Sequence, residues 1–231
     1  MICVPIIESK ISKAIEQIEK ANKITDMIEL RLDYFSALNE KELKQLITKC
    51  KKPVICTCRR MEESGFFKES ESKRMTVLKN AMKFKADYID LEFDTPKIQK
   101  EKIFEYKKEH KLKTKIILSK HYFGFTPQYK ELQKLLDKMH SKKIEVVKIV
   151  TKANTHEDNK IMFELLRYAK RKGIKLIAFC MGRMGRDSRI LSMPLGSFIT
   201  FASLEEGKES ADGQIPIVEL KKIYSGLRMM F

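Results

Sequence analysis

A chain of 231 residues, 43% of them hydrophobic, is long enough to bury one large core, and no apolar run in it approaches the roughly 18 residues of a membrane span. The formal net charge of +16 allows two interpretations, a nucleic-acid-binding surface or helix faces rich in solvated lysine. The lysines are spread over nearly every predicted helix and mostly alternate with glutamates, which favours the second interpretation and a field that attracts small anions.

Short β-like runs alternate with longer amphipathic segments along the whole chain. The predicted strands are 2–7, 27–32, 54–58, 88–92, 115–119, 146–150, 176–179 and 198–201. The predicted helices are 12–22, 40–49, 72–83, 97–109, 128–140, 156–172 and 217–227. Eight strands, each followed by a helix or a short helical piece, predict a (β/α)8 TIM barrel, with a doubly wound open sheet as the rival. No linker or shift in composition marks a second domain, so residues 1–231 are expected to form a single catalytic domain.

The cysteines bear on the cellular compartment. They are Cys3, Cys50, Cys56, Cys58 and Cys180. Their odd number and the absence of a CxxC pair favour reduced thiols in a cytoplasmic protein and argue against a metal site of the usual spacing. The apolar first residues lack a basic leader and a small-residue cleavage site, which favours a first strand over a signal peptide.

Chemistry in such a barrel lies at the carboxyl ends of the strands and in the loops that follow. The second predicted strand ends with Glu29, Arg31 and Asp33, which alternation places on one face. These three residues are either a structural layer of ion pairs or contacts to a substrate.

The third and fourth strands also end in charged residues. Arg59 continues the alternation of the third strand, and Glu63 follows in the loop at the rim. Asp90 and Glu92 close the fourth strand. These two carboxylates either hold a divalent cation or are neutralised by nearby basic groups.

Two residues of the next strands are candidates for catalysis. His121, at the end of the fifth strand, is a general base or a hydrogen-bonded structural histidine. Lys148 interrupts the apolar, β-branched sixth strand. Desolvation would lower the pKa of this amine and make it a nucleophile toward a carbonyl, giving a Schiff base. The alternative is a lysine at a strand end whose head reaches water.

Two loops complete the predicted site. The segment 181–189 contains two glycines and several arginines, which predicts an anion-binding loop, and a guanidinium can hold a carboxylate through two hydrogen bonds. The final loop, 204–214, contains charged residues and two glycines and is either a mobile lid or an ordinary surface loop.

Taken in order, these motifs resemble those of the type I 3-dehydroquinate dehydratases of the shikimate pathway, which leads to chorismate and the aromatic amino acids. The resemblance covers almost the whole chain, and its specificity comes from the order and spacing of the pieces. The pieces are Glu29-Leu30-Arg31-Leu32-Asp33, Thr57-Cys58-Arg59 with Glu63, Asp90-Leu91-Glu92, Ser119-Lys120-His121, Val147-Lys148-Ile149, Met181-Gly182 with Ser188-Arg189, Thr200-Phe201, and Ser210-Ala211-Asp212-Gly213-Gln214.

The resemblance implies a role for each candidate. Lys148 would form the Schiff base, His121 would be the general acid and base, and Glu63 would orient His121. Arg189 would bind the substrate carboxylate. The remaining implied substrate contacts are Glu29, Arg31, Arg59, Ser210, Gln214, Met181 and Phe201. The final loop is slightly longer than in some members of the family, a departure that affects the match at Ser210 more than the match at Gln214.

The resemblance further implies a syn elimination of water from 3-dehydroquinate, with neither metal nor organic cofactor, in a homodimer that binds no nucleic acid and no membrane. Two rivals remain. A Schiff-base aldolase acting on a sugar phosphate would need a phosphate site at the ends of strands seven and eight, where this chain offers an arginine suited to a carboxylate. A basic nucleic-acid-binding protein would show strongly salt-dependent binding.

Overall fold

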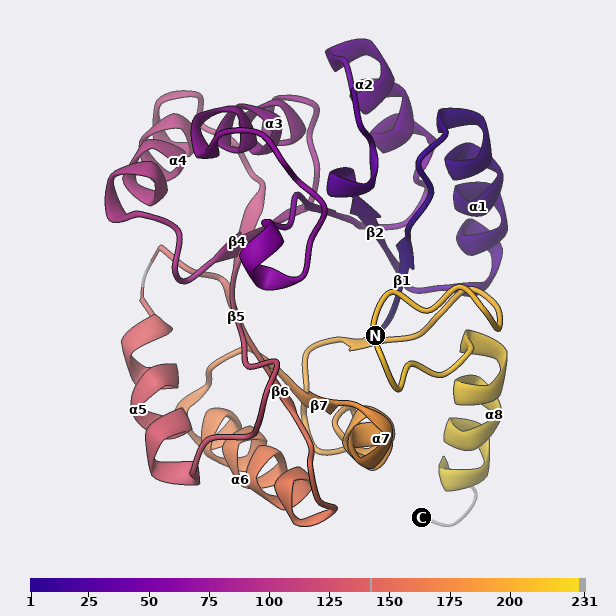
Figure 1. Ribbon diagram of the computed structural model, residues 1–231, viewed down its shortest axis with the longest axis vertical. Helices are drawn as coiled ribbons and strands as arrows, with labels where there is room; N and C mark the ends of the chain where they lie inside the picture. Colours follow the sequence, from indigo (N-terminus) through magenta and orange to yellow (C-terminus); the bar gives the residue numbers. More distant parts are fainter. Residues whose placement is uncertain (142, 229–231) are drawn as a thin grey trace.

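The computed structural model describes residues 1–141 and 143–228, in which parallel strands form a central barrel surrounded by helices (Figure 1). The strands are β1 (Ile2–Ile6), β2 (Met27–Arg31), β3 (Val54–Thr57), β4 (Tyr88–Glu92), β5 (Lys115–His121), β6 (Val146–Lys152), β7 (Leu176–Met181) and β8 (Thr200–Phe201). The helices are α1 (Ile11–Ile24), α2 (Glu40–Lys49), α3 (Glu71–Lys83), α4 (Lys97–Glu109), α5 (Tyr129–Met139), α6 (Glu157–Lys172), α7 (Arg186–Leu191) and α8 (Ile217–Arg228), with short 3-10 turns η1 (Leu32–Tyr34), η2 (Met61–Glu63) and η3 (Arg183–Gly185). The predicted (β/α)8 barrel is confirmed.

The sheet follows the chain around the barrel. Its order is β7-β6-β5-β4-β3-β2-β1-β8, and every ladder is parallel. The ring closes between β8 and β7, where the backbone N–H of Phe198 donates to the carbonyl of Leu176 at 2.8 Å. Because the strands are parallel, all their carboxyl ends meet at one mouth of the barrel.

Alternation along each strand separates two apolar layers. Residues such as Tyr88, Ile117, Val146 and Ile177 form a cluster inside the barrel, whereas their outward neighbours pack beneath the helices. With a side-chain period of two, Lys148 follows Val146 onto the inner face. It therefore lies inside the barrel and is only 6% exposed, which favours the interpretation of a desolvated amine over that of a lysine whose head reaches water.

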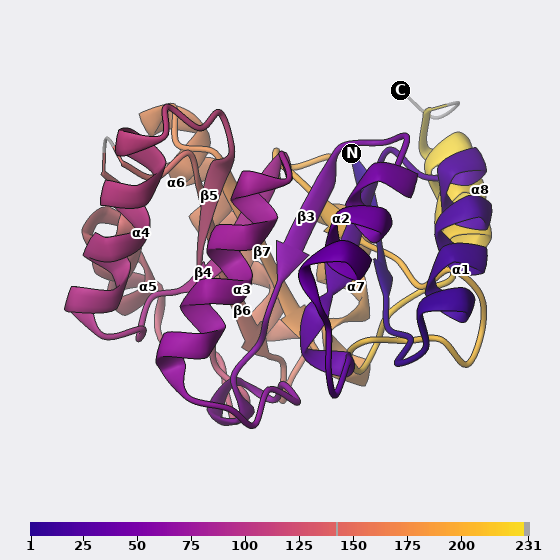
Figure 2. The ribbon, with the colours of Figure 1, turned by 90° about the horizontal axis from the view of Figure 1, so that it is seen from above.

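The helices lie outside the strands (Figure 1), and in the side view α4 and α5 lie at one end of the molecule and α1 and α8 at the other (Figure 2). Two of them begin at clear caps: Asn39 and Glu42 form a capping box at α2, and the Ser70 hydroxyl accepts from the N–H of Lys73 at α3. In the described part of the chain, no helix has both the length and the apolar character needed to cross a bilayer.

The structure differs from the prediction at several element ends. Strands β5, β6 and β7 each run two residues further than predicted, because their ladders continue to the pairs His121↔Val150 and Lys152↔Met181. Asp33 lies in the turn η1 and not on the alternating strand. It returns to bind Arg31 there, so the prediction that alternation sets its direction was wrong.

Candidate active site

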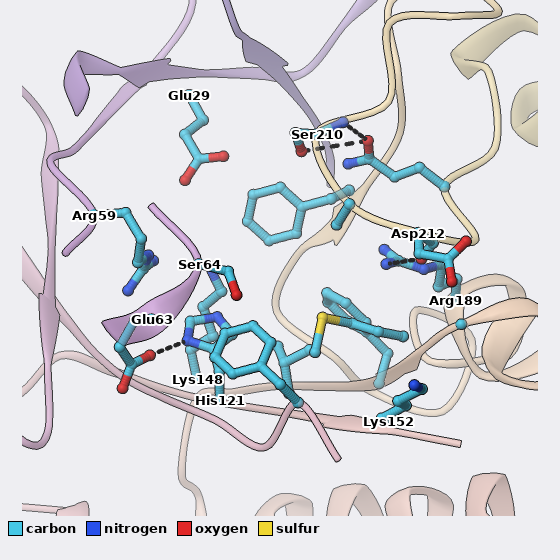
Figure 3. Close-up of a pocket in the computed structure, with 18 of the residues that line it drawn as sticks. Glu29, Arg59, Glu63, Ser64, His121, Lys148, Lys152, Arg189, Ser210 and Asp212 are labelled. Carbon is cyan, nitrogen blue, oxygen red and sulfur yellow. Dashed lines mark hydrogen bonds and ion pairs between the residues drawn. The ribbon is translucent and has the colours of Figure 1, made fainter. Parts of the chain in front are cut away.

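All eleven residues named as site candidates from the sequence line one cavity of about 320 Å³ at the carboxyl ends of the strands. Figure 3 shows Arg59 and Glu63 on one side of this cavity, with Arg189 and Asp212 on the other. The eleven are Glu29, Arg31, Arg59, Glu63, His121, Lys148, Met181, Arg189, Phe201, Ser210 and Gln214. The barrel thus brings together residues that are up to 185 positions apart in the sequence, from 29 to 214.

Lys148 has a carboxylate partner, which the sequence argument for a desolvated amine did not foresee. Its Nζ lies 3.1 Å from Oδ2 of Asp90 and 4.7 Å from the centre of the Phe201 ring. The register Glu92↔Ser119↔Lys148 fixes its height in the barrel. The amine is therefore buried, held in one direction by a carboxylate and an aromatic face, and open to the cavity.

Asp90 is the centre of the charge network beneath the cavity. Arg59 Nη2 lies 2.9 Å from its Oδ2, and the Ser119 hydroxyl donates to its Oδ1 at 2.6 Å. Burial opposes ionisation of Asp90, but Arg59 and Lys148 outweigh burial and hold the pKa of this carboxyl well below its usual range. An ionised Asp90 provides a fixed negative charge next to the amine.

The structure argues against a cation site at Asp90 and Glu92, because basic side chains already form ion pairs with both carboxylates. Glu92 pairs with Arg59 Nη1 at 3.3 Å and with Arg74 from helix α3. Among the residues the structure describes, no group of three or more His, Cys, Asp or Glu side chains is arranged to hold a metal ion. Neutralisation by basic groups, the other interpretation, is what the structure has.

His121 and Glu63 form a pair at the mouth. Nδ1 of His121 lies 2.7 Å from Oε2 of Glu63, which is buried within η2 and not exposed on a rim loop (Figure 3). If the carboxylate accepts from Nδ1–H, the lone pair of Nε2 stays free to take a proton. Burial, together with the nearby charges of Arg59 and Lys148, lowers the pKa of His121 well below its ordinary 6.5, so the imidazole is neutral near pH 7.

Arg189 lies across the cavity from this pair. The side chain is 2% exposed, its Nη2 donates to the carbonyl of Asp212 at 2.9 Å, and its guanidinium stacks 4.7 Å from the Phe179 ring centre. Burial lowers its pKa to about 10, which still leaves it charged at neutral pH. Its buried Nε has no hydrogen-bond partner in the described part of the chain. A buried guanidinium with a spare donor is suited to a carboxylate ligand.

The arginines around α7 divide by position. Only Arg189 reaches the cavity, while Arg186 is half exposed and pairs with Glu219 at 2.5 Å. The glycines of this segment allow close packing: a Cβ on Gly185 would lie 2.6 Å from the carbonyl oxygen of Cys180. Gly213, at φ +76°, likewise lets the last loop approach Gly182.

Of the two remaining walls of the cavity, one is polar and the other is apolar. Glu29 accepts a hydrogen bond from the Thr57 hydroxyl at 2.6 Å, and Arg31 donates two hydrogen bonds to Asp33. The end of β2 therefore contains an ion pair, Arg31–Asp33, and also places Glu29 and Arg31 in the lining of the cavity. The Ser210 N–H and hydroxyl donate to Oε1 of Gln214 at 2.7 and 3.3 Å. Met181 and Phe201 provide the apolar wall.

Sequence reasoning missed several residues that line the same cavity. They are Ser64, Phe123, Val150, Lys152, Phe179, Gly182, Ala211 and Asp212. Lys152 was hidden because the sixth strand was predicted to end at residue 150. Asp212 acts through its backbone carbonyl, which no side-chain pattern reveals, although its place between Ser210 and Gln214 was a usable signal.

Comparisons with known proteins agree on one family. The family model described as Type I 3-dehydroquinase matches residues 2–230. The 3-dehydroquinate dehydratase of Methanococcus maripaludis is 36% identical over 223 residues, 96% of this chain and 98% of the relative. That of Methanocaldococcus jannaschii is 34% identical over 97% of both chains. The crystal structure of the type I enzyme of Clostridium difficile, with covalently modified comenic acid, is 26% identical and has a TM-score of 0.87, covering 100% of this chain and 92% of that one.

Proposed function

This chain belongs to the type I 3-dehydroquinase family and is a hydro-lyase that dehydrates 3-dehydroquinate, and we propose that it does so through a Schiff base on Lys148. The observation that carries the proposal is the position of this amine, buried on the inner face of β6 and open to a cavity that also holds a neutral histidine.

Substrate orientation follows from the charges around the cavity. Arg189 receives the substrate carboxylate, because it is buried, charged and has Nε free for a second hydrogen bond. Gln214 and Ser210 border the same side and offer further polar contacts. Glu29, Arg31 and Arg59 also line the cavity and contact the ring hydroxyls, with Glu29 and Arg59 on the side opposite Arg189 (Figure 3). This arrangement directs the C3 ketone toward Lys148.

The first chemical stage forms the imine. The amine of Lys148 adds to the C3 carbonyl, and the resulting carbinolamine takes up a proton and loses water to give a protonated imine. The positive nitrogen withdraws electrons from C2 and so makes the C2 proton acidic. Asp90, ionised and 3.1 Å from Nζ, stabilises the positive charge that the imine carries.

The second stage eliminates water. His121 takes the C2 proton on Nε2, and the electron pair of the C2–H bond forms an enamine. The imidazolium then gives this proton to the C1 hydroxyl, which leaves as water with the C1–O bonding pair. The nitrogen lone pair re-forms the protonated imine, and the C2=C3 pair of the enamine becomes the C1=C2 double bond. Hydrolysis releases 3-dehydroshikimate and restores the amine. One base serves both steps on one face, which makes the elimination syn.

Glu63 orients the imidazole and stabilises its charged form between the two proton transfers. The imine serves as the electron sink, so the proposed steps use no metal and no organic cofactor. The charge changes in these steps occur on the Lys148 nitrogen and on His121, both of which line the cavity.

The test is an assay of 3-dehydroquinate dehydration, followed by the ultraviolet absorbance of the conjugated product. Lys148→Met should abolish turnover, and the matched control Lys160→Met, which removes an exposed helix lysine, should leave it unchanged. Full activity in Lys148→Met would contradict the proposed covalent mechanism.

We further propose that the chain is a single catalytic domain that works in the cytoplasm as a homodimer, with a small-molecule substrate as its ligand. The five cysteines are all unpaired, as expected for a reducing compartment. The family resemblance supports the dimer, and sedimentation velocity at the concentrations used in the assay would measure it.

A further inference from the structure

A buried chain of alternating charges leads away from Lys148 and out of the cavity. Lys148 contacts Asp90 at 3.1 Å, Asp90 contacts Arg59 at 2.9 Å, and Arg59 contacts Glu92 at 3.3 Å. Glu92 then pairs with Arg74, which does not line the cavity but extends from helix α3. The chain thus connects the proposed nucleophile to the outer helical layer.

Arg74 is held rigidly at the far end of this chain. Its side chain is 0% exposed, and all three of its nitrogens are engaged. Nη1 donates to Glu92 and to the Cys58 carbonyl at 3.1 Å, while Nη2 donates to the Thr95 hydroxyl at 2.8 Å. Nε and Nη2 also bind Glu71, one turn earlier on α3, at 2.8 and 2.7 Å. A guanidinium fixed at so many points has little freedom to move.

We propose that Arg74 is a positioning residue for the dehydration reaction: by neutralising Glu92 it leaves Arg59 free to hold Asp90, and so sets the place and charge environment of the Lys148 amine. This inference rests on the proposed role of Lys148 as the nucleophile.

Competition for Arg59 is the physical reason. Arg59 lies between two buried carboxylates, and its Nη1 also donates to the Ser119 hydroxyl at 3.0 Å. With Arg74 present, the Glu92 carboxylate forms ion pairs with two guanidinium groups, those of Arg59 and Arg74. Without Arg74, Arg59 is, among the described residues, the one cationic side chain left on Glu92, whose Oε1 otherwise accepts from the Arg60 N–H at 3.4 Å, and a buried carboxylate with a single countercharge attracts it strongly.

A shift of Arg59 toward Glu92 changes the surroundings of Lys148 at the other end of this chain of ion pairs. Asp90 then loses its contact with Arg59 and keeps Lys148 Nζ as its remaining cationic partner, which draws the amine away from the ketone and slows attack. Substrate binding suffers less, because the carboxylate is held by Arg189 on the other side of the cavity. The defect therefore falls on kcat and on the rate of imine formation more than on KM.

The experiment uses Arg74→Met, Arg74→Lys and the double variant Arg74→Met/Glu92→Gln, with Lys73→Met as the matched control. Lys73 is the preceding residue on α3, exposed and paired with Glu69. For each variant, kcat and KM are measured together with the rate at which borohydride traps the substrate adduct in a single turnover. Circular dichroism and thermal melting record folding.

Arg74→Met should lower kcat and the trapping rate by on the order of 10²-fold, the loss expected when a reacting group moves by about 1 Å. KM should rise by a smaller factor, because Arg189 still holds the carboxylate and the displaced Arg59 loses its contact with a ring hydroxyl. The double variant should recover most of this loss, because the neutral amide that replaces the Glu92 carboxylate no longer competes for Arg59. Arg74→Lys should lie between Arg74→Met and the parent, and Lys73→Met should match the parent.

Two results would overturn the inference. Parent-like trapping in Arg74→Met would show that Arg59 needs no help from Arg74, and an equal loss in the single and double variants would reduce Arg74 to a packing role. If Arg74→Met does not fold, Arg74→Lys and the double variant decide. The inference then requires Arg74→Lys to trap the adduct more slowly than the parent, and the double variant to trap it at a rate close to that of the parent. A parent enzyme without an adduct on Lys148 would contradict the proposed mechanism and this inference together, whereas the two results above contradict the inference alone.

Discussion

Arg189→Lys should weaken substrate binding although it keeps the positive charge. The guanidinium offers two parallel donors to a carboxylate, whereas an ammonium is a compact point charge. In the structure Nη2 is already used by the Asp212 carbonyl at 2.9 Å and Nε is free, so a lysine cannot serve both the loop and the substrate.

The magnitude follows from the hydrogen bonds at stake. Losing one charge-assisted bond costs about 1.5–3 kcal/mol, which corresponds to a rise in KM of roughly tenfold to 150-fold. If Arg189 also aligns C3 with Lys148, kcat falls as well.

Arg186→Lys is the matched control. Arg186 lies on the same helix, is half exposed and pairs with Glu219, and such surface pairs contribute about 0–1 kcal/mol. Measurement of kcat and KM for both variants decides the question. If Arg189→Lys and Arg186→Lys both behave like the parent, the substrate carboxylate is bound elsewhere and this side of the site has been assigned incorrectly.

Three further predictions concern the base and the scaffold. His121→Ala should reduce turnover by roughly 10²–10⁴-fold while borohydride still traps an adduct, and near-normal turnover would make His121 a structural residue. Because burial lowers the pKa of His121 and only the neutral imidazole accepts the C2 proton, its acid limb in kcat/KM should lie below pH 6.5, with activity lost as pH falls through it; a limb at or above 6.5 contradicts this. Gly185→Ala should destabilise the protein by about 1–3 kcal/mol, since the new Cβ would lie 2.6 Å from the Cys180 oxygen, whereas Gly124→Ala meets nothing within 4 Å; equal melting temperatures would refute the packing argument.

The barrel was predictable because its signal is periodic and local. Each apolar run became a strand, and the helical segments between them had clear amphipathic spacing. The ends of β5, β6 and β7 were not predictable in the same way, because the ladders continue through polar residues such as Lys120 and Lys152. Pairing with a neighbouring strand, and not local hydrophobicity, sets where these strands end.

The site was predictable as a set of side chains but not as a network. Alternation and the barrel rule place Lys148, His121 and Arg59 at one mouth. Which charge pairs with which depends on three-dimensional distances between residues such as Asp90 and Lys148, which are 58 positions apart. Arg74 had no sequence signal, because a helical arginine among lysines has the pattern of a solvated face.

The most direct test of the central claim is to locate the covalent intermediate. The enzyme is incubated with 3-dehydroquinate and borohydride, digested, and mapped by mass spectrometry, with a sample lacking borohydride as the control. Our account predicts one substrate-derived mass increase, on the peptide that contains Lys148. A label on another lysine such as Lys152, or an active enzyme that acquires no label, would contradict it.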